Sequence, residues 1–270
     1  DTGDLLFMPY TGKVRTQPGT QDDPLSGYAS YYSKSNEKAL PGYYEVLLET
    51  HHIKVELTAS DRVAFHRYTF PKIAEKYVMI NLKDANGDDR PTDTYLEQVN
   101  DTTVRGYRCS TGWSKQQQVY FTAVFSEPVH LALYHDSISV QGSILQGVDV
   151  KGNIIVASDV EKLDMKVGIS PVSMENAAAN IQQEIADWNF ERIVGETTAK
   201  WNAELSKLQV TTTDTVAKRI FMLLYNLPCS TIIIRNIEVQ IRMCMVTRVL
   251  LIILYSHCGI RIVQLIRCIH

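Results

Sequence analysis

The main part of this chain has almost no cysteine. Cys109 is the only cysteine in the first two hundred residues, and the other four, Cys229, Cys244, Cys258 and Cys268, crowd the end. None has the C-x-x-C spacing of common zinc and redox sites. A single thiol cannot form a disulfide framework, but a chain of 270 residues is long enough to bury a sizeable hydrophobic core.

The chain also lacks an excess of one charge and a long apolar run. Its formal net charge of −3 gives no electrostatic reason to expect nucleic acid as a partner. The longest apolar run, Val249 to Leu254, is too short to cross a bilayer, so we expect no membrane span. The first residues, Asp1 to Asp4, have neither the basic start nor the apolar stretch of a signal peptide.

Short strand-like runs fill the chain up to about residue 170. Ile53 to Thr58 alternates apolar and polar residues with period two, which is typical of a half-buried strand. His66 and Tyr68 share one face of another run, and because the histidines lack metal-ligand spacing, we expect His66 to be a hydrogen-bonded strand residue. Many short strands separated by turns predict a mainly β fold, an antiparallel β-sandwich over residues 1–170.

Helical periodicity begins after the Ser170-Pro171 step. Ser173 is placed to cap a first helix. A second helix is indicated by the 3.6-residue spacing of Ile193, Val194, Thr197, Trp201, Leu205 and Leu208. We therefore expect two connector helices, a helical linker over residues 171–221.

One loop superficially suggests a calcium site. Asp84, Asn86, Asp88 and Asp89 are spaced like metal ligands, but Gly87 comes too early for the order of an EF-hand. Asn86-Gly87 is instead a strong hairpin signal, so we expect a plain turn and no metal ligands in this chain.

Short motifs along the chain resemble a known family. They occur in the order Asp4–Pro9, Ser26–Tyr28, Pro41–Tyr44, Val55–Ala59, His66–Pro71, Gly106–Arg108, Gly112–Trp113, Val119–Phe121, Phe125–Ser126, Glu175–Ala177 and Trp201–Leu205. This order and spacing resemble the N-terminal domain of glycoside hydrolase family 92, the bacterial exo-acting α-mannosidases. The resemblance covers roughly residues 1 to 221. Because the family's chain starts well before Asp1, we expect the first strands of the domain to be missing.

The resemblance implies a β-sandwich linked by helices to an (α/α)6 barrel, with the active site between them. The family removes terminal α-linked mannose from glycans with inversion and needs calcium, and its general acid and base are carboxylates of the barrel. The parent enzyme is therefore expected to be calcium-dependent and periplasmic or secreted, with a mannose-containing glycan as its partner. This chain is predicted to be inactive by itself, with no cofactor of its own, because the catalytic residues and calcium ligands are expected in the barrel.

Four residues are candidates for sugar contact. Trp113, in a turn beside Arg108, could stack on a sugar face, or it could plug the end of the sandwich. Asp1 and Asp4 match a family segment near the sugar pocket, although residues at a chain terminus often fray. Two alternatives to a mannosidase fragment stay open: a stand-alone carbohydrate-binding sandwich and a structural module that only scaffolds the barrel.

The composition changes abruptly at about Met222. Residues 222–270 contain five arginines but no lysine, and one glutamate but no aspartate. Ser256 to Val263 can be back-translated so that a shifted reading frame spells S-L-W-D-T-Y-R, which resembles a motif of the family's barrel, and two neighbouring segments behave alike. We therefore predict that residues 222–270 are an irregular, out-of-frame tail and not a domain, with a divergent domain as the alternative.

Overall fold

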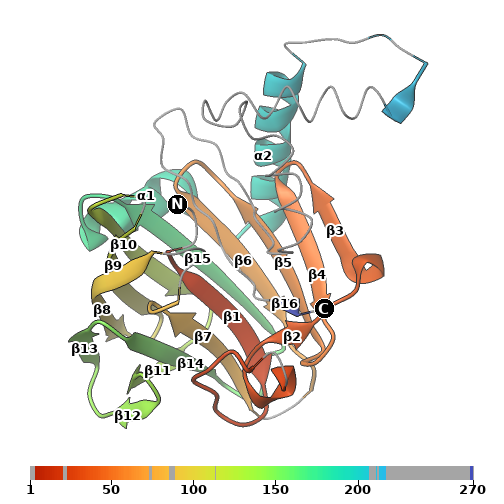
Figure 1. Cartoon of the computed structure of the whole chain (residues 1–270). Helices are drawn as coiled ribbons and strands as arrows, with labels where there is room; N and C mark the ends of the chain where they lie inside the picture. The colour runs from red at the N-terminus through yellow and green to blue at the C-terminus, as the bar shows by residue number, and fades with distance from the viewer. Residues whose placement is uncertain are drawn as a thin grey trace.

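In the computed structural model of the whole chain, two antiparallel sheets form the body of the protein (Figure 1). The structure describes residues 4–20, 23–72, 75–84, 89–112, 114–206, 211, 213–216 and 268–269. The predicted mainly β sandwich followed by two helices is confirmed. Asp1, Trp113, the residues 85–88 of the predicted turn and nearly all of the predicted tail lie outside the described residues.

The smaller sheet has five strands. In spatial order these are β1 (Leu6–Thr11), β7 (Lys76–Asn81), β14 (Val150–Val156), β11 (Val129–His135) and β12 (Ile138–Val140). A separate pairing joins β2 (Ser30–Tyr31) in parallel to β16 (Cys268–Ile269), and two short 3-10 helices, η1 (Pro24–Ser26) and η2 (Lys34–Asn36), flank β2.

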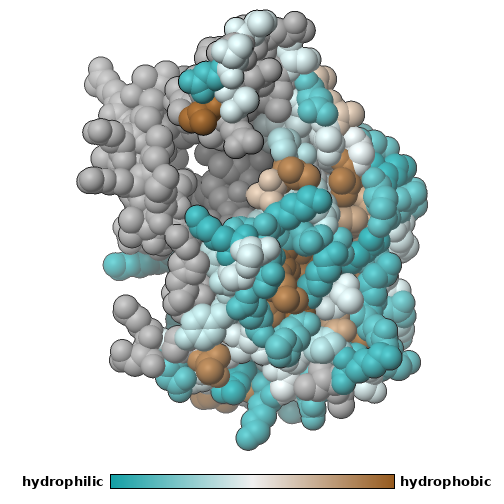
Figure 2. All heavy atoms as spheres, turned by 90° about the vertical axis from the view of Figure 1, so that its right-hand side faces the viewer, coloured by the Kyte–Doolittle hydropathy of each residue, from teal (hydrophilic) through white to brown (hydrophobic). Residues whose placement is uncertain are grey.

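The larger sheet has nine strands. Their spatial order is β13 (Ile144–Gly147), β8 (Arg90–Asn100), β9 (Thr103–Thr111), β10 (Gln117–Phe125), β15 (Lys162–Ser170), β6 (Val63–Thr69), β5 (Ile53–Ala59), β4 (Tyr43–Leu48) and β3 (Glu37–Leu40). Figure 2 shows the side that carries β3, where hydrophilic side chains predominate and apolar ones lie in small separate groups. The coloured part of this face therefore shows no single large apolar patch.

The main core lies between the two sheets. Alternation along β5 turns Ile53, Val55 and Leu57 inward, where all three are buried. Across the core, Phe7 of β1 meets Phe121 of β10 edge to face, with ring centroids 5.9 Å apart. Such aromatic contacts join the two sheets by dispersion as well as by removal of apolar area from water.

Two helices cover part of the outer face of the larger sheet. They are α1 (Met174–Glu184) and α2 (Phe190–Leu205), and as predicted, Ser173 caps α1 by accepting a hydrogen bond from the Asn176 amide. Strand β6 faces both layers, since Val63 and Phe65 pack with apolar helix residues in a second buried cluster. No helix among the described residues has the length and apolar character needed to cross a bilayer.

Close approach and ion pairing hold the helices on the sheet. A Cβ added at Gly168 of β15 would lie 2.2 Å from the carbonyl oxygen of Ala177, so only glycine lets α1 come this near. Arg67 of β6 donates from Nε and Nη2 to both carboxylate oxygens of Asp164, at 2.9 and 3.1 Å, and from Nη1 to Glu191 at 2.5 Å. Its guanidinium also lies 4.4 Å from the ring centroid of Phe190.

The predicted strand histidine is confirmed. His66 is buried in β6, and its Nδ1 lies 2.6 Å from the hydroxyl of Tyr68 on the same strand face. The pair gives a polar ring a partner inside the core, which is what a buried imidazole requires.

Candidate functional site

The structure brings together two of the four predicted sugar-contacting residues. Asp4 lies just before β1, and its Oδ1 accepts a hydrogen bond from Nη1 of Arg108 in β9 at 2.6 Å. The Arg108 side chain has no exposed surface, whereas 11% of the Asp4 side chain is exposed. Arg108 also donates from Nε to the carbonyl oxygen of Leu82 at 2.9 Å. The buried Arg108 therefore holds the Asp4 carboxylate in position.

Two further polar residues complete this Asp4 cluster, which consists of Asp4, Arg108, Ser110 and Gln117. Gln117 of β10 donates from Nε2 to Oδ2 of Asp4, and the Ser110 hydroxyl lies 3.5 Å from Oδ1. Gln117 and Ser110 are register partners and share the inward face of the sheet with Arg108. Sequence reasoning missed Gln117, although a polar residue at an inward position near Arg108 was a usable signal.

The electrostatics of Asp4 are those of a partly desolvated carboxylate. Burial raises the pKa of its carboxyl group above the ordinary value of 3.8, and the nearby charge of Asp89 adds to this rise. The Arg108 guanidinium and the Gln117 hydrogen bond oppose the rise without cancelling it. Nη2 of Arg108 is buried and has no hydrogen-bond partner within the described residues. The unpartnered donor is therefore enclosed within the cluster, whereas the Asp4 carboxylate is partly exposed at the rim.

Gly112, which follows β9, lies against Asp89. The Gly112 amide donates to the carbonyl oxygen of Ser114 at 2.9 Å, and a Cβ added at Gly112 would lie 1.8 Å from Oδ1 of Asp89. A side chain at position 112 would therefore require the Asp89 side chain to move. Trp113 itself and Asp1 lie outside the described residues, so their contact with a sugar stays a prediction.

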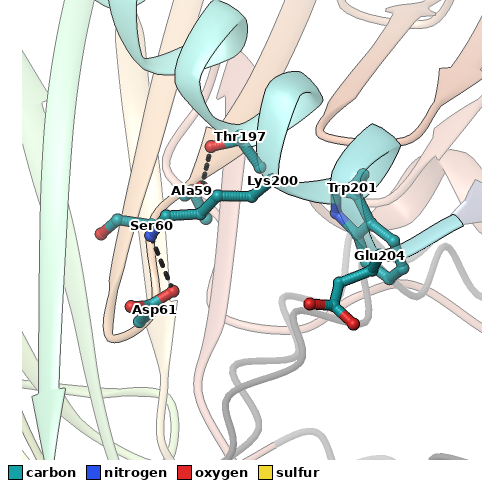
Figure 3. A pocket seen from close by; sticks show the side chains of 7 residues that line it. All are labelled: Ala59, Ser60, Asp61, Thr197, Lys200, Trp201 and Glu204. Atoms are coloured by element: carbon teal, nitrogen blue, oxygen red, sulfur yellow. Dashed lines mark hydrogen bonds and ion pairs between the residues drawn. The ribbon is translucent and has the colours of Figure 1, made fainter. Parts of the chain in front are cut away.

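A pocket lies at a second place, between α2 and the turn from β5 to β6. Its lining residues are Ala59, Ser60, Asp61, Thr197, Lys200, Trp201 and Glu204. Figure 3 shows Lys200 reaching from α2 to Asp61, where Nζ and Oδ1 are 3.1 Å apart, while Trp201 and Glu204 project from the same helix. The Thr197 hydroxyl donates to the Ala59 carbonyl at 2.6 Å. These bonds attach α2 to the sheet, so the residues that make them stabilise the fold.

The described residues do not offer a calcium site. No three histidine, cysteine or acidic side chains gather closely enough within them to hold a metal ion. Calcium prefers six to eight oxygen ligands, and the Asp4 cluster contains a single carboxylate facing an arginine.

Comparison with family models places the chain in two parts. Residues 1–170 match the model described as the glycosyl hydrolase family 92 N-terminal domain, and residues 176–236 match the model described as the family 92 catalytic domain. The second match begins within α1, so the helices predicted as connectors fall in sequence that the family assigns to its catalytic domain. It ends beyond the composition change at Met222. No curated protein sequence matches the chain.

Solved structures of the same family are similar to the chain. The chain is 31% identical to a family GH92 α-mannosidase from Bacteroides thetaiotaomicron in complex with mannoimidazole, with a TM-score of 0.73, 77% of this chain covered and 28% of the other. It is 27% identical to the GH92 glycosyl hydrolase ccman5, with a TM-score of 0.70 and coverages of 82% and 31%. An inverting GH92 mannosidase from B. thetaiotaomicron VPI-5482, at 22% identity, TM-score 0.64 and coverages of 77% and 27%, shares the fold. The chain thus spans about three tenths of the length of these proteins.

Proposed function

This chain belongs to glycosyl hydrolase family 92, and from this premise we propose that it forms the sandwich part of an enzyme that hydrolyses terminal α-linked mannose from glycans with inversion. Support comes from the family models and from the 31% identity to an α-mannosidase whose structure holds mannoimidazole. We further propose that the parent enzyme depends on calcium and is periplasmic or secreted.

The observation that carries a role for the sandwich is the Asp4 cluster. A fully buried arginine and the amide of Gln117 both donate to one carboxylate that reaches the rim of the domain. Holding a charged group in this way removes its conformational freedom before a ligand arrives. In the proposal, Asp4 accepts hydrogen bonds from sugar hydroxyls, while Arg108 and Gln117 keep its orientation. Trp113 then supplies a ring for stacking.

The hydrolytic step itself belongs to the barrel in this proposal. Inversion needs one carboxylic acid to protonate the leaving oxygen and one carboxylate to activate a water, with the two groups far enough apart to admit that water. We assign neither role to a residue of this chain. The purified chain should therefore release no mannose from α-mannosides, with or without added calcium, and turnover that survives repurification would contradict this.

A chimera provides the direct test of function. Residues 4–170 would replace the corresponding domain of the similar Bacteroides α-mannosidase, and mannose release from an α-mannoside would be followed by NMR, which also reports the anomer formed. We expect hydrolysis with inversion, and at least a tenfold lower kcat/KM for Asp4→Asn, equivalent to about 1.4 kcal/mol of lost stabilisation. A folded chimera that binds mannoimidazole yet cleaves no α-mannoside would refute the proposal.

A further inference from the structure

Three tyrosines form a row across the outer face of the larger sheet. Tyr95 of β8 is the register partner of Tyr107 in β9, which is the register partner of Tyr120 in β10. The rings of Tyr95 and Tyr107 are stacked, with centroids 5.4 Å apart and planes within 7°, and the centroid of Tyr120 lies 5.6 Å from that of Tyr107. All three are only partly buried. We call Tyr95, Tyr107 and Tyr120 the tyrosine row.

The row and the Asp4 cluster are on opposite faces of one sheet. Tyr107 and Arg108 are successive residues of β9, so their side chains point to opposite sides. Arg108 enters the space between the sheets, whereas Tyr107 faces outward beside α1, which packs on β15 and β10. A ligand on the tyrosine row therefore cannot touch Asp4 through the sheet, and the row is a separate surface.

Hydrogen bonds hold the rings in place. The Tyr107 hydroxyl donates to Oδ2 of Asp93 at 2.8 Å, and the Tyr95 hydroxyl donates to Oε2 of Glu97 at 3.1 Å. Gln146, from the edge strand β13, donates from Nε2 to Asp93 at 3.1 Å and lies 3.0 Å from the Tyr107 hydroxyl. Rings fixed in this way lose little further freedom when a ligand binds.

The charges around the row favour a neutral ligand. Glu97 is paired with Arg105 at 2.7 Å, and Arg105 also reaches Glu175 of α1 at 3.1 Å. Asp93 already accepts hydrogen bonds from Tyr107 and Gln146. An anionic ligand would meet an excess of carboxylates, and a cationic one would compete with pairs already made. Partly exposed aromatic rings beside an amide and hydroxyls suit the CH faces and hydroxyls of a sugar.

We propose that the tyrosine row, with Gln146, is a second carbohydrate-binding surface that holds a neutral mannose oligosaccharide away from the Asp4 cluster. The inference rests on the proposed function for its choice of glycan. In this proposal the sandwich binds one branch of a branched glycan, while the terminal mannose of another branch is removed elsewhere on the enzyme.

Calorimetry on the whole chain with a linear mannotetraose tests the proposal. We expect affinity to fall about five- to tenfold for Tyr107→Ala and for Tyr120→Ala, the size of effect that aromatic contacts give. Gln146→Ala, at an exposed position, removes an amide beside the rings without removing a ring and should lower the affinity about two- to threefold. Tyr134→Ala, which changes a partly buried tyrosine on the other sheet, serves as the matched control and should bind as the unchanged chain does. Because the ligand is uncharged, added salt should have little effect.

A second measurement uses the unmodified chain and therefore does not depend on whether the variants fold. Cys109 lies on the same face of β9 as Tyr107, two residues further on, and is partly exposed. Saturating mannotetraose should slow alkylation of Cys109, as followed by peptide mass spectrometry on the unmodified chain. The proposal is overturned if Cys109 is not protected, if Tyr107→Ala and Gln146→Ala bind normally, or if Asp4→Asn removes all binding. None of these results affects the chimera assay, in which failure would count against the proposed function instead.

Discussion

Two arginines are buried against the larger sheet, and their surroundings differ. Arg67, on the outer face, satisfies its guanidinium with Asp164, Glu191 and the ring of Phe190. Arg108, on the inner face, has one carboxylate, one carbonyl and a buried Nη2 with no hydrogen-bond partner among the described residues. A complete network stabilises a fold. The incomplete one leaves a buried donor without a partner, and its carboxylate, Asp4, stays partly exposed at the rim.

Breaking the complete network should have the largest effect. Asp164→Ala would leave Arg67 as a buried cation without its bidentate partner, and we expect a loss of about 3–5 kcal/mol in the free energy of unfolding. Urea denaturation followed by circular dichroism measures this. Glu191→Ala, whose side chain is 74% exposed, is the matched control and should cost less than about 1 kcal/mol. Equal losses in the two variants would show that the comparison of the two arginines is mistaken.

Breaking the incomplete network should cost less stability. Asp4→Asn removes the charge pair with Arg108. The variant still offers Arg108 an acceptor and no longer desolvates a charged carboxylate, so we expect a loss of only about 1–2 kcal/mol in the same denaturation experiment. Gln117→Leu, which removes only the amide donor, should cost about 1 kcal/mol. A loss for Asp4→Asn as large as that for Asp164→Ala would make Asp4 a structural residue.

The two networks should respond to pH in opposite directions. The pKa of Asp4 is raised in the folded state, so its contribution to stability falls as pH rises from its ordinary value of 3.8 to the raised value. The pKa of Glu191 is lowered, first by its hydrogen bond from Arg67, so its contribution is present above 4.5 and lost as pH falls through the lowered value. Denaturation of Asp4→Asn and Glu191→Gln between pH 3 and 6 separates the two. Parallel pH trends would contradict this assignment.

Sugar stacking at Trp113 should give a smaller effect, of about 1 kcal/mol in binding free energy. Trp113→Ala should abolish weak, millimolar mannose binding near the Asp4 cluster while the far-UV spectrum stays unchanged. Calorimetry on both proteins measures this. If the variant binds mannose as before, Trp113 is a packing residue at the end of the sandwich.

The smallest effect on stability should come from the tail. If residues 222–270 are out of frame, ending the chain at Phe221 should raise solubility and leave the unfolding free energy unchanged within about 0.5 kcal/mol. Runs such as Val249 to Leu254 would be sticky and lack protecting charges. Limited proteolysis and DNA sequencing around codon 222 check the two halves of this prediction. A protease-resistant tail in a cooperative core would support a divergent domain.

The sequence predicted local elements better than long-range partners. The predicted run Ile53 to Thr58 falls within β5, because alternation with a buried face leaves a period-two signal. Strand β8 escaped notice, since its polar residues outnumber its one fully buried apolar residue, Leu96.

The same limit applies to the site. Arg108 and Asp4 were singled out through motif resemblance, but their contact joins residues 104 apart in sequence. Neither periodicity nor spacing reports such a pairing. The sequence did not indicate that Arg67 pairs with Asp164 and Glu191 for the same reason. Strand pairing brings these residues together, and it depends on the topology of the whole sandwich.

Strand β6 is shared by both hydrophobic clusters, with Ala64 and Tyr68 in the core between the sheets and Val63 and Phe65 beneath the helices. The helices cannot lift away without wetting the same strand that closes the sandwich. Sheet and helices should therefore melt as one cooperative unit, with the amides of β6 among the last to exchange with deuterium. A protein built this way resists gradual fraying at its helical side and unfolds in a single step.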